Sequence, residues 1–291
     1  MSKHYHFKSG NSPLLISMPH VGTSIPKEIA AHMTQAALQM PDVDWHLPLL
    51  YDMAEKYDAT VLSAEYMRYV IDLNRSTEDT SLYPGQDVTG LCPIDTFDKQ
   101  PIYVAGKQPD ELEIRSRIEQ YWRPYHNKLT TELKRIHALH GIALLWDAHS
   151  IASQVPRFFD GKLPDLNFGT ADTESCDESL ESALKNMMLN YQNGIEKKLG
   201  SAEKFSYVFN GRFKGGYITR HYGVPTLNIH ALQMEMNQCI YMQNSPHYNY
   251  QESLAQEVKP LLSDLLATCL AWAHNFKTTV NKDQSLPSRP I

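Results

Sequence analysis

Short apolar runs alternate with helix-like patterns along this chain. In the first hundred residues, three mostly apolar runs have the length of strands, and one segment repeats apolar residues at helical spacing. The predicted strands cover residues 13–18, 59–63 and 69–73, and the predicted helix covers residues 45–56. Residues 75–101 are rich in Thr, Asp, Pro and Gly and show no period, so they predict a long loop of the kind that often has a function.

The clearest helical pattern covers residues 110–140. Asp110 is suited to the N-cap, and Gly141 stands just past the end, where helices often stop. Pro124 inside the pattern predicts a kink or a division into two helices, because proline lacks the N–H that an inner turn requires. Residues 142–146 then form an apolar run typical of a central strand, which leads directly into Asp147-Ala148-His149-Ser150.

The second half of the chain continues this alternation. It predicts an irregular stretch at 151–175, a helix at 179–199, a strand at 207–210, a glycine-rich loop with a short helix, a strand from 226 towards 235, and a helix at 250–274. Strands that alternate with helices favour an α/β fold, with a largely parallel or mixed sheet and helices on both faces. The chain shows no internal repeat and no break in composition, so we predict one domain over residues 1–274 and a polar tail at 275–291.

Composition narrows the class of protein. Of the 291 residues, 42% are hydrophobic and 21% are charged, as in an ordinary globular protein. The net charge of −6 argues against nucleic acid as a partner, because phosphate binding requires a basic face. No apolar stretch approaches the ~20 residues of a membrane span, and the four cysteines form no Cys-x-x-Cys pair. We therefore expect a soluble cytoplasmic protein with reduced thiols.

Candidate catalytic side chains stand where predicted strands end. His20 follows the first strand, Asp147 and His149 follow the apolar run after the long helix, and Glu235 ends a later strand. Sheets of this kind bind ligands at the carboxyl ends of their strands, so we expect these side chains to converge. Taken singly, each has a plainer interpretation, such as a capping or surface residue. The other histidines are interpreted as core or surface residues.

Such a group is suited to a metal ion. A hydrolytic zinc takes three protein ligands, usually neutral His and a carboxylate, and keeps one position for water. His20 and His149 supply two ligands, and a carboxylate from Asp44 or Asp147 supplies the third. Asp44 is equally well interpreted as the N-cap of the helix that it precedes. Asp147 is equally suited to orient a ligand histidine.

Basic residues near the same strand ends predict an anionic substrate. Arginine is suited to bidentate binding of a carboxylate, and an exposed, solvated side chain is the alternative in each case. The candidates are Arg75, Arg212, Lys214 and Arg220.

Five motifs occur in an order that matches a known family. They are Ser17-Met18-Pro19-His20-Val21-Gly22, Asp44-Trp45-His46, Ile71-Asp72-Leu73-Asn74-Arg75, Asp147-Ala148-His149-Ser150 and Asn210-Gly211-Arg212-Phe213-Lys214-Gly215-Gly216. Together they resemble the N-formylglutamate deformylase (N-formylglutamate amidohydrolase) family of bacterial histidine degradation, from about residue 14 to residue 272. The last motif is particularly specific.

The resemblance implies hydrolysis of N-formyl-L-glutamate, a small dicarboxylate, to formate and L-glutamate. It also implies a phosphorylase/hydrolase-like α/β fold of three layers, distantly similar to zinc carboxypeptidases and aspartoacylases, and a divalent metal, with zinc expected. On that pattern His20 and His149 bind the metal, Asn74 and Arg75 hold a substrate carboxylate, and Glu235 is the general base.

One position departs from that pattern. The distant relatives carry a metal-binding carboxylate three residues after the first histidine, and here that position is Thr23. We therefore choose Asp44 as the third ligand and keep Asp147 as the reserve. Two other functions stay open. One is the same chemistry on another N-acyl acidic amino acid, and the other is a binding or regulatory protein that has the fold without the metal.

Overall fold

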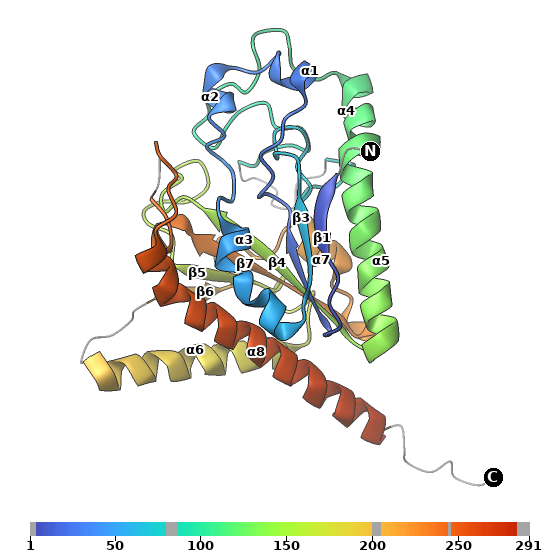
Figure 1. The fold of residues 1–291 in the computed structure, drawn as a ribbon, viewed down its shortest axis with the longest axis vertical. Coiled ribbons are helices and arrows are strands. Elements are labelled where there is room, and N and C mark those ends of the chain that lie inside the picture. Colours follow the sequence, from blue (N-terminus) through green and yellow to red (C-terminus); the bar gives the residue numbers. More distant parts are fainter. Residues whose placement is uncertain (1–3, 80–86, 200–204, 244–245, 284–291) are drawn as a thin grey trace, which may run out of the picture.

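The structure is a computed structural model that describes residues 4–79, 87–199, 205–243 and 246–283. Its centre is a seven-stranded sheet in the order β1-β3-β2-β4-β7-β5-β6 (Figure 1). β1 pairs antiparallel with β3 and β5 pairs antiparallel with β7, whereas the other neighbours are parallel, so the predicted mixed sheet is confirmed. The strands are β1 (Tyr5–Lys8), β2 (Leu14–Met18), β3 (Thr60–Ala64), β4 (Ala143–Ile151), β5 (Leu166–Gly169), β6 (Tyr207–Phe209) and β7 (Ile229–Asn237).

The middle strands β2, β4 and β7 are buried along nearly their whole length. Successive side chains of a strand point to opposite faces, so each of these strands contributes to both faces of the sheet. In β4, Leu144, Trp146 and Ala148 lie in the core on one face, and Asp147 and His149 alternate with them on the other. The strand therefore runs past residue 146, its predicted end, because its polar residues continue the alternation instead of stopping it.

Helices cover both faces of the sheet, as predicted, and produce three layers (Figure 1). On one face, α3 (Leu47–Leu50), α6 (Glu178–Leu199) and α8 (Glu252–Asp283) bury their apolar residues in one core cluster. On the other face, α5 (Arg123–His140) and α7 (Tyr217–Tyr222) share a second cluster with β2, β3 and β4. Removal of this apolar surface from water is the main term that favours the layered fold.

The helical region predicted at 110–140 is divided in two. α4 (Glu111–Arg117) begins after Asp110, whose side chain accepts a hydrogen bond from a first-turn N–H. A π-helical turn (Ile118–Trp122) separates α4 from α5, which carries Pro124 in its first turn and ends at Gly141 with a φ of 72°. Proline is tolerated there because a first-turn N–H has no helical partner. The N-cap and the glycine stop are confirmed, and the predicted interruption takes the form of the π-helical turn just before Pro124.

Short helices fill the connections. The helix predicted at 45–56 consists of α3 and a 3-10 turn, because His46 adopts a left-handed φ of 65° and delays the helix start. The short elements are α1 (Lys27–Ala30), α2 (Gln35–Leu38) and the 3-10 turns Asp52–Tyr57, Pro225–Leu227 and Gln238–Ile240.

Several predictions along the chain are wrong or incomplete. Residues 69–73 form turns, not a strand: their side chains are buried, but their backbone bonds the Arg117 side chain and the carbonyl of Leu91 instead of a neighbouring strand. β5 lies inside the stretch predicted to be irregular, and the sequence pattern does not predict β1. α8 continues past its predicted end at residue 274, and residues 284–291 of the predicted tail lie outside the described part.

The four cysteines form no disulfide, as expected. Cys92, Cys176 and Cys269 are buried, and Cys239 is exposed. Among the described helices, none combines the length and the apolar character that crossing a membrane requires.

Candidate active site

His20 stands just beyond the end of β2, in a tight loop that the sequence fixes locally. A Cβ atom added to Gly22 would lie 2.2 Å from the carbonyl oxygen of Tyr66, so only glycine allows the chain to pass there. The N–H of Asp44 donates to the carbonyl of His20 at 3.1 Å, which joins the Asp44 segment to this loop. Two segments far apart in the sequence thus meet at the carboxyl end of β2, and both side chains are buried.

His149 and Glu235 lie side by side in the sheet, because the parallel register of β4 and β7 pairs them directly. Both alternate with apolar residues that pack under α6 and α8, so their side chains share the opposite face. Both are buried. The structure therefore places both residues within long strands, whereas His149 was predicted to follow its strand and Glu235 to end its strand.

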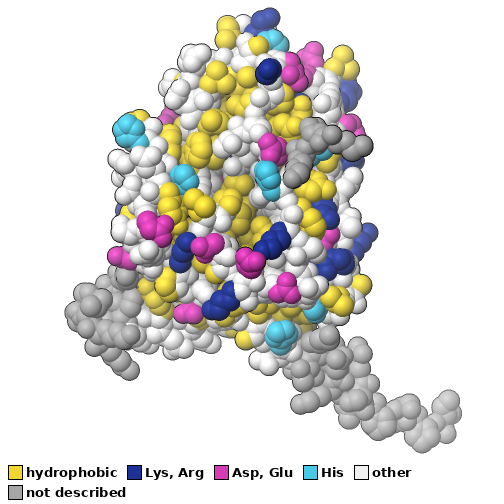
Figure 2. Space-filling model, in the orientation of Figure 1, with side chains coloured by type: hydrophobic (Ala, Val, Ile, Leu, Met, Phe, Trp, Pro, Cys, Tyr) yellow, Lys and Arg dark blue, Asp and Glu magenta, His cyan; other side chains and the backbone are white. Residues whose placement is uncertain are grey.

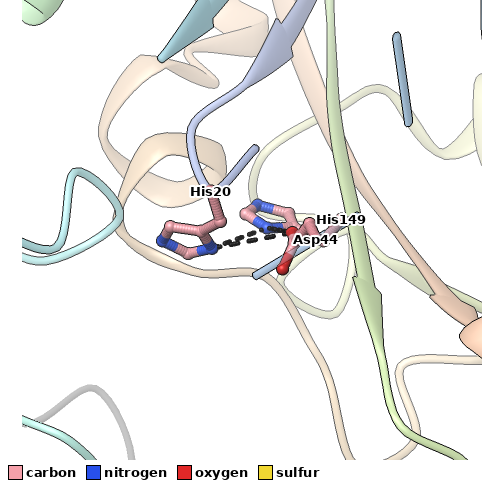
Figure 3. Close-up of side chains that lie close together, drawn as sticks. All are labelled: His20, Asp44 and His149. Atoms are coloured by element: carbon pink, nitrogen blue, oxygen red, sulfur yellow. Dashed lines mark hydrogen bonds and ion pairs between the residues drawn. The ribbon is translucent and has the colours of Figure 1, made fainter. Parts of the chain in front are cut away.

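Three buried side chains point toward one another at this place: His20, Asp44 and His149 (Figure 3). Nδ1 of His149 lies 3.1 Å from Nδ1 of His20 and 3.2 Å from Oδ2 of Asp44. Nδ1 of His20 lies 3.8 Å from the same oxygen. Tetrahedral zinc, with bonds near 2.0–2.1 Å, holds its ligand atoms about 3.3 Å apart. The spacing therefore fits one divalent metal ion.

A carboxylate holds the far nitrogen of each imidazole ring. Nε2 of His20 lies 2.7 Å from Oδ1 of Asp72, and Nε2 of His149 lies 3.1 Å from Oδ2 of Asp147. An ionised carboxylate only accepts hydrogen bonds, so in each neutral ring Nε2 carries the proton and donates it. The lone pair of each Nδ1 is then directed at the shared point, which is the arrangement in which histidine binds a metal.

Asp44 faces both histidines. Its Oδ2 also accepts a hydrogen bond from the N–H of Ser150 at 3.2 Å, which holds the carboxylate in place. The alternative interpretation of Asp44 as a helix N-cap is wrong, because the N-cap of the following helix is His46. Thr23, the position at which the distant relatives carry a carboxylate, is exposed. Asp44 therefore takes the geometric place of the third ligand.

Asp147 lies behind His149, on the side away from His20. Its Oδ1 accepts a hydrogen bond from Ser17 at 3.2 Å, and its Oδ2 accepts one from Thr219 at 3.3 Å in addition to the contact with His149. With both oxygens engaged in this way, Asp147 is suited to orient the imidazole of His149.

The two histidines have opposite pKa shifts. Burial lowers the pKa of His149, but the carboxylates of Asp147 and Asp44 outweigh it and hold this pKa well above its ordinary value. The pKa of His20 is lowered, because burial and the nearby Arg68 guanidinium prevail. A metal ion competes with protons for the same lone pairs, so a group that attracts a proton in this way also suits a metal cation.

Glu235 is held by Gln233, two residues earlier in β7. Gln233 Nε2 donates to Oε2 of Glu235 at 3.0 Å, while Gln233 Oε1 accepts from the N–H of Gly216 at 2.7 Å and so fixes the orientation of the amide. Burial raises the pKa of Glu235 to about 8, with His149 opposing the rise and Asp44 adding to it. A carboxylate with a pKa in this range is suited to accept and release a proton.

A cavity joins the three metal-binding candidates to Glu235. Asn74 and three arginines, Arg68, Arg75 and Arg212, are among its described lining residues. Arginine recognises carboxylates by geometry as well as by charge, so the cavity suits a small ligand with more than one carboxylate.

Asn74 lies between His149 and the start of α7. Its Oδ1 accepts a hydrogen bond from the N–H of Ile218 at 2.8 Å, and its Nδ2 lies 3.1 Å from Nε2 of His149. A Cβ atom on Gly216 would lie 2.3 Å from Nδ2 of Asn74. Glycine at this position therefore allows Asn74 to approach the site.

Two of the predicted basic residues lie elsewhere. Lys214 pairs with Asp172 at 2.9 Å near the surface, and Arg220 donates through Nε to the carbonyl of Gly215 at 2.9 Å. Neither belongs to the lining of the cavity as the structure describes it. The prediction that they contact a substrate carboxylate is therefore not supported by their position, whereas Arg212 reaches the cavity.

Arg68 and Asp72 are site residues that the sequence interpretation missed. Nη2 of Arg68 donates to Oδ2 of Asp72 at 2.7 Å, and Asp72 in turn holds His20. Burial would raise the pKa of Asp72, but His20 and Arg68 hold it well below its ordinary value. The spacing of four between an arginine and an aspartate was an available signal. The strand predicted at 69–73 obscured it, because a strand would not bring these two side chains together.

Known proteins match nearly the whole chain. A family model described as N-formylglutamate amidohydrolase matches residues 12–242. An N-formylglutamate deformylase of Pseudomonas putida is 45% identical over 272 residues, which covers 94% of this chain and 97% of the relative. A second N-formylglutamate deformylase, from Pseudomonas aeruginosa, is 45% identical over 266 residues and covers 91% of this chain and 96% of the relative.

Solved structures share the fold. The crystal structure of an N-formylglutamate amidohydrolase from Ralstonia eutropha has a TM-score of 0.72 at 22% identity and covers 93% of this chain and 97% of that chain. The crystal structure of a gene product of Agrobacterium tumefaciens has a TM-score of 0.68 at 16% identity and covers 94% of this chain and 97% of that chain. From the family match and the curated relatives, this chain belongs to the N-formylglutamate amidohydrolase family.

Proposed function

We propose that the protein hydrolyses N-formyl-L-glutamate to formate and L-glutamate. The observation that carries the proposal is one cavity that combines the buried group His20, Asp44 and His149 with Glu235 and arginines. The two deformylases at 45% identity support the choice of substrate. This reaction would place the protein in histidine degradation, and we propose a cytoplasmic location for it.

We propose a divalent metal, with zinc expected, bound by Nδ1 of His20, Oδ2 of Asp44 and Nδ1 of His149. When bound, such an ion lowers the pKa of water towards ~7 and polarises a carbonyl. Asp72 and Asp147 keep the two rings in the required orientation through their bonds to Nε2. Partners of this kind typically raise metal affinity by 10- to 100-fold.

Glu235 is proposed to move the proton. Its carboxylate accepts a proton from the attacking water as the new bond to the formyl carbon forms. It then delivers this proton to the glutamate nitrogen as the carbon–nitrogen bond breaks, so formate and the free amine leave. The hydrogen bond from Gln233 occupies Oε2 of Glu235, which leaves the other oxygen as the proton carrier.

The arginines are proposed to bind the two substrate carboxylates. Arg75, beside Asn74, and Arg212 line the cavity from different segments of the chain. Arg68 adds a third positive charge next to the ligand histidines, and its buried Nε has no hydrogen-bond partner among the described residues. The lining also holds the carboxylates of Asp44, Asp72 and Glu235, so it is the proposed divalent cation together with the arginines that would balance a substrate with two negative charges. Lys214 and Arg220 are left out of the proposal because of their positions.

The surface agrees with a small-molecule substrate. On the face that Figure 2 shows, Lys and Arg side chains are interspersed with Asp and Glu and do not form a broad basic patch. With a net charge of −6, we propose no nucleic-acid partner.

A substrate panel tests the proposal. Purified protein is supplied with zinc and given N-formyl-, N-acetyl- and N-formimino-L-glutamate, and both released glutamate and the released acid are measured. We expect the N-formyl compound to have the highest kcat/KM. A higher value for the N-acetyl or N-formimino compound would assign the site to another N-acyl amino acid, and no hydrolysis of any compound would contradict the enzymatic function.

A further inference from the structure

Arg157 joins two loops that are far apart in the sequence. Its Nε and Nη2 lie 2.9 and 2.8 Å from Oδ1 of Asp87. Its Nη1 donates to Oδ1 of Asp95 at 2.7 Å and to the carbonyl of Thr96 at 2.8 Å. The guanidinium therefore binds two separate points of the loop that follows Arg75, and it does so from the loop that follows β4.

Three residues of this cluster, Asp87, Thr96 and Arg157, are next to a residue that lines the cavity. Val88 and Thr89 follow Asp87, Phe97 follows Thr96, and Phe158 follows Arg157. The lining residues also contact one another across the two loops, since the rings of Phe97 and Phe158 pack edge to face with their centroids 4.9 Å apart. Arg157 itself does not belong to the lining, so it acts through these neighbours.

Arg157 differs from an ordinary surface ion pair. Its side chain is only 6% exposed, whereas those of Asp87 and Asp95 are 35% exposed. Burial lowers the pKa of Arg157, but hydrogen bonds from the guanidinium to Asp95 and Asp87 outweigh it and raise this pKa. A buried guanidinium that bonds charged partners through several N–H groups is held in one geometry. Exposed ion pairs, in contrast, contribute little to stability. Removal of the guanidinium leaves two carboxylates that water can reach, so the chain should still fold.

We propose that Arg157 is a positioning residue that keeps the wall formed by Val88, Thr89, Phe97 and Phe158 closed over the substrate. The inference rests on the proposed function for its substrate. If the closed wall is populated less, the apparent affinity falls by the same fraction, while the reacting groups keep their geometry. The signature is therefore a rise in KM with little change in kcat.

The test compares Arg157→Ala with Arg157→Lys in the metal-loaded protein. We expect KM for N-formylglutamate to rise roughly tenfold in the alanine variant, with kcat changed by less than about threefold and metal content unchanged. Lysine keeps the positive charge but cannot bind both carboxylates as the forked guanidinium does, so the KM of Arg157→Lys should lie between the values of the parent protein and Arg157→Ala. An unchanged KM in Arg157→Ala would overturn the proposal.

Arg135→Ala is the matched control. Arg135 also bonds a carboxylate and a carbonyl, those of Glu132 and Gly10, but it lies on α5 beside the start of β3, away from the cavity. We expect this variant to lose comparable stability and to keep its KM. A similar rise in KM in this control would show a general effect of destabilisation and would contradict the specific role of Arg157.

The acidic partner Asp95 gives an independent route. Asp95→Asn should raise KM in the same direction, and its combination with Arg157→Ala should raise KM no further, because both changes break the interaction between Arg157 and Asp95. Asp87 is left unchanged because it also pairs with Lys99 at 2.8 Å. The Asp95→Asn variant also keeps the proposal testable if Arg157→Ala fails to fold. Additive effects would contradict the shared role.

Hydrogen exchange separates this inference from the proposed function. Amides of residues 87–99 should exchange faster in Arg157→Ala than in the parent protein, whatever substrate the enzyme uses. Faster exchange in a protein that does not hydrolyse N-formylglutamate would keep the positioning role and remove the proposed substrate. Unchanged exchange would remove the positioning role itself.

Discussion

Each histidine of the proposed metal site presents Nδ1 to a common point because a carboxylate holds its Nε2. Asp72 does this for His20 and Asp147 does it for His149. The proposed metal site therefore depends on five side chains, of which Asp44 is the proposed third ligand. At the scale of single residues, the proposed role of each histidine depends on which of its ring nitrogens faces the point shared with Asp44.

Glu235→Gln tests the role of the proposed proton carrier. Glutamine keeps the size of the side chain but cannot accept the proton, so we expect kcat to fall by about 10²- to 10⁴-fold. Because the residue is not a proposed ligand, metal content measured by elemental analysis should stay at the parent value. Near-normal turnover in this variant would remove Glu235 from the mechanism.

Asp44→Asn and Asp147→Asn distinguish a ligand from the residue behind one. An amide oxygen is a much poorer zinc ligand than a carboxylate, so Asp44→Asn should lose bound metal at purification. Asp147→Asn should weaken affinity by roughly 10- to 100-fold and regain full occupancy in added zinc. Titration with a competing chelator measures both affinities. A larger loss of metal affinity in Asp147→Asn than in Asp44→Asn would make Asp147 the third ligand.

The sequence could indicate part of this site and not the rest. His20, Asp44, His149 and Glu235 were recognisable from their types and motifs, and the structure brings them together. Lys214 and Arg220 were chosen for their charge and for their place in and just after a glycine-rich loop near a strand end, and neither feature gives the direction of the side chain.

At the scale of elements, alternation explains where the polar residues lie. β4 places apolar residues under α6 and α8 and turns Asp147 and His149 to the other face, and β7 does the same with Gln233 and Glu235. The period of two was visible in the sequence, but the polar residues were taken as the end of the strand. Residues 69–73 show the opposite error, since buried apolar residues there pack in turns.

Gly216→Ala tests how closely two elements must approach. The added methyl group would lie 2.3 Å from Nδ2 of Asn74, and it would displace the amide that bonds Ile218 at the start of α7. We expect a clear loss of kcat/KM with a folded protein.

Gly194→Ala is the control, because its Cβ meets no atom within 4 Å. It lies in α6, where alanine should stabilise the helix by about 0.5–1 kcal/mol. Unchanged activity in Gly216→Ala would show that the close approach of Asn74 is not needed.

At the scale of the whole molecule, buried neutral histidines make stability depend on pH. Burial lowers the pKa of His126 to about 3 and that of His230 to about 4. Below pH 6.5 the unfolded chain binds protons that the folded protein does not bind, so stability falls as the pH drops towards those values. This follows from two core positions, one on each face of the sheet, and not from the active site.

His126→Gln tests this dependence. Nε2 of His126 lies 2.9 Å from the carbonyl of Leu73, and glutamine can donate there without titrating. Between pH 7 and pH 5 the parent should lose about 2 kcal/mol of unfolding free energy through this residue alone. Urea unfolding with chelator present at both pH values measures the difference. An equal loss in the variant would contradict the assignment.

Metal dependence is the central claim, and one measurement tests it most directly. Metal content per chain and glutamate release from N-formylglutamate are determined on the same sample, before chelation, after chelation and after zinc is restored. The site predicts about one metal ion per chain. Activity should be lost when the chelator removes the metal, and it should return when zinc is restored. Full turnover by metal-free protein would contradict the claim.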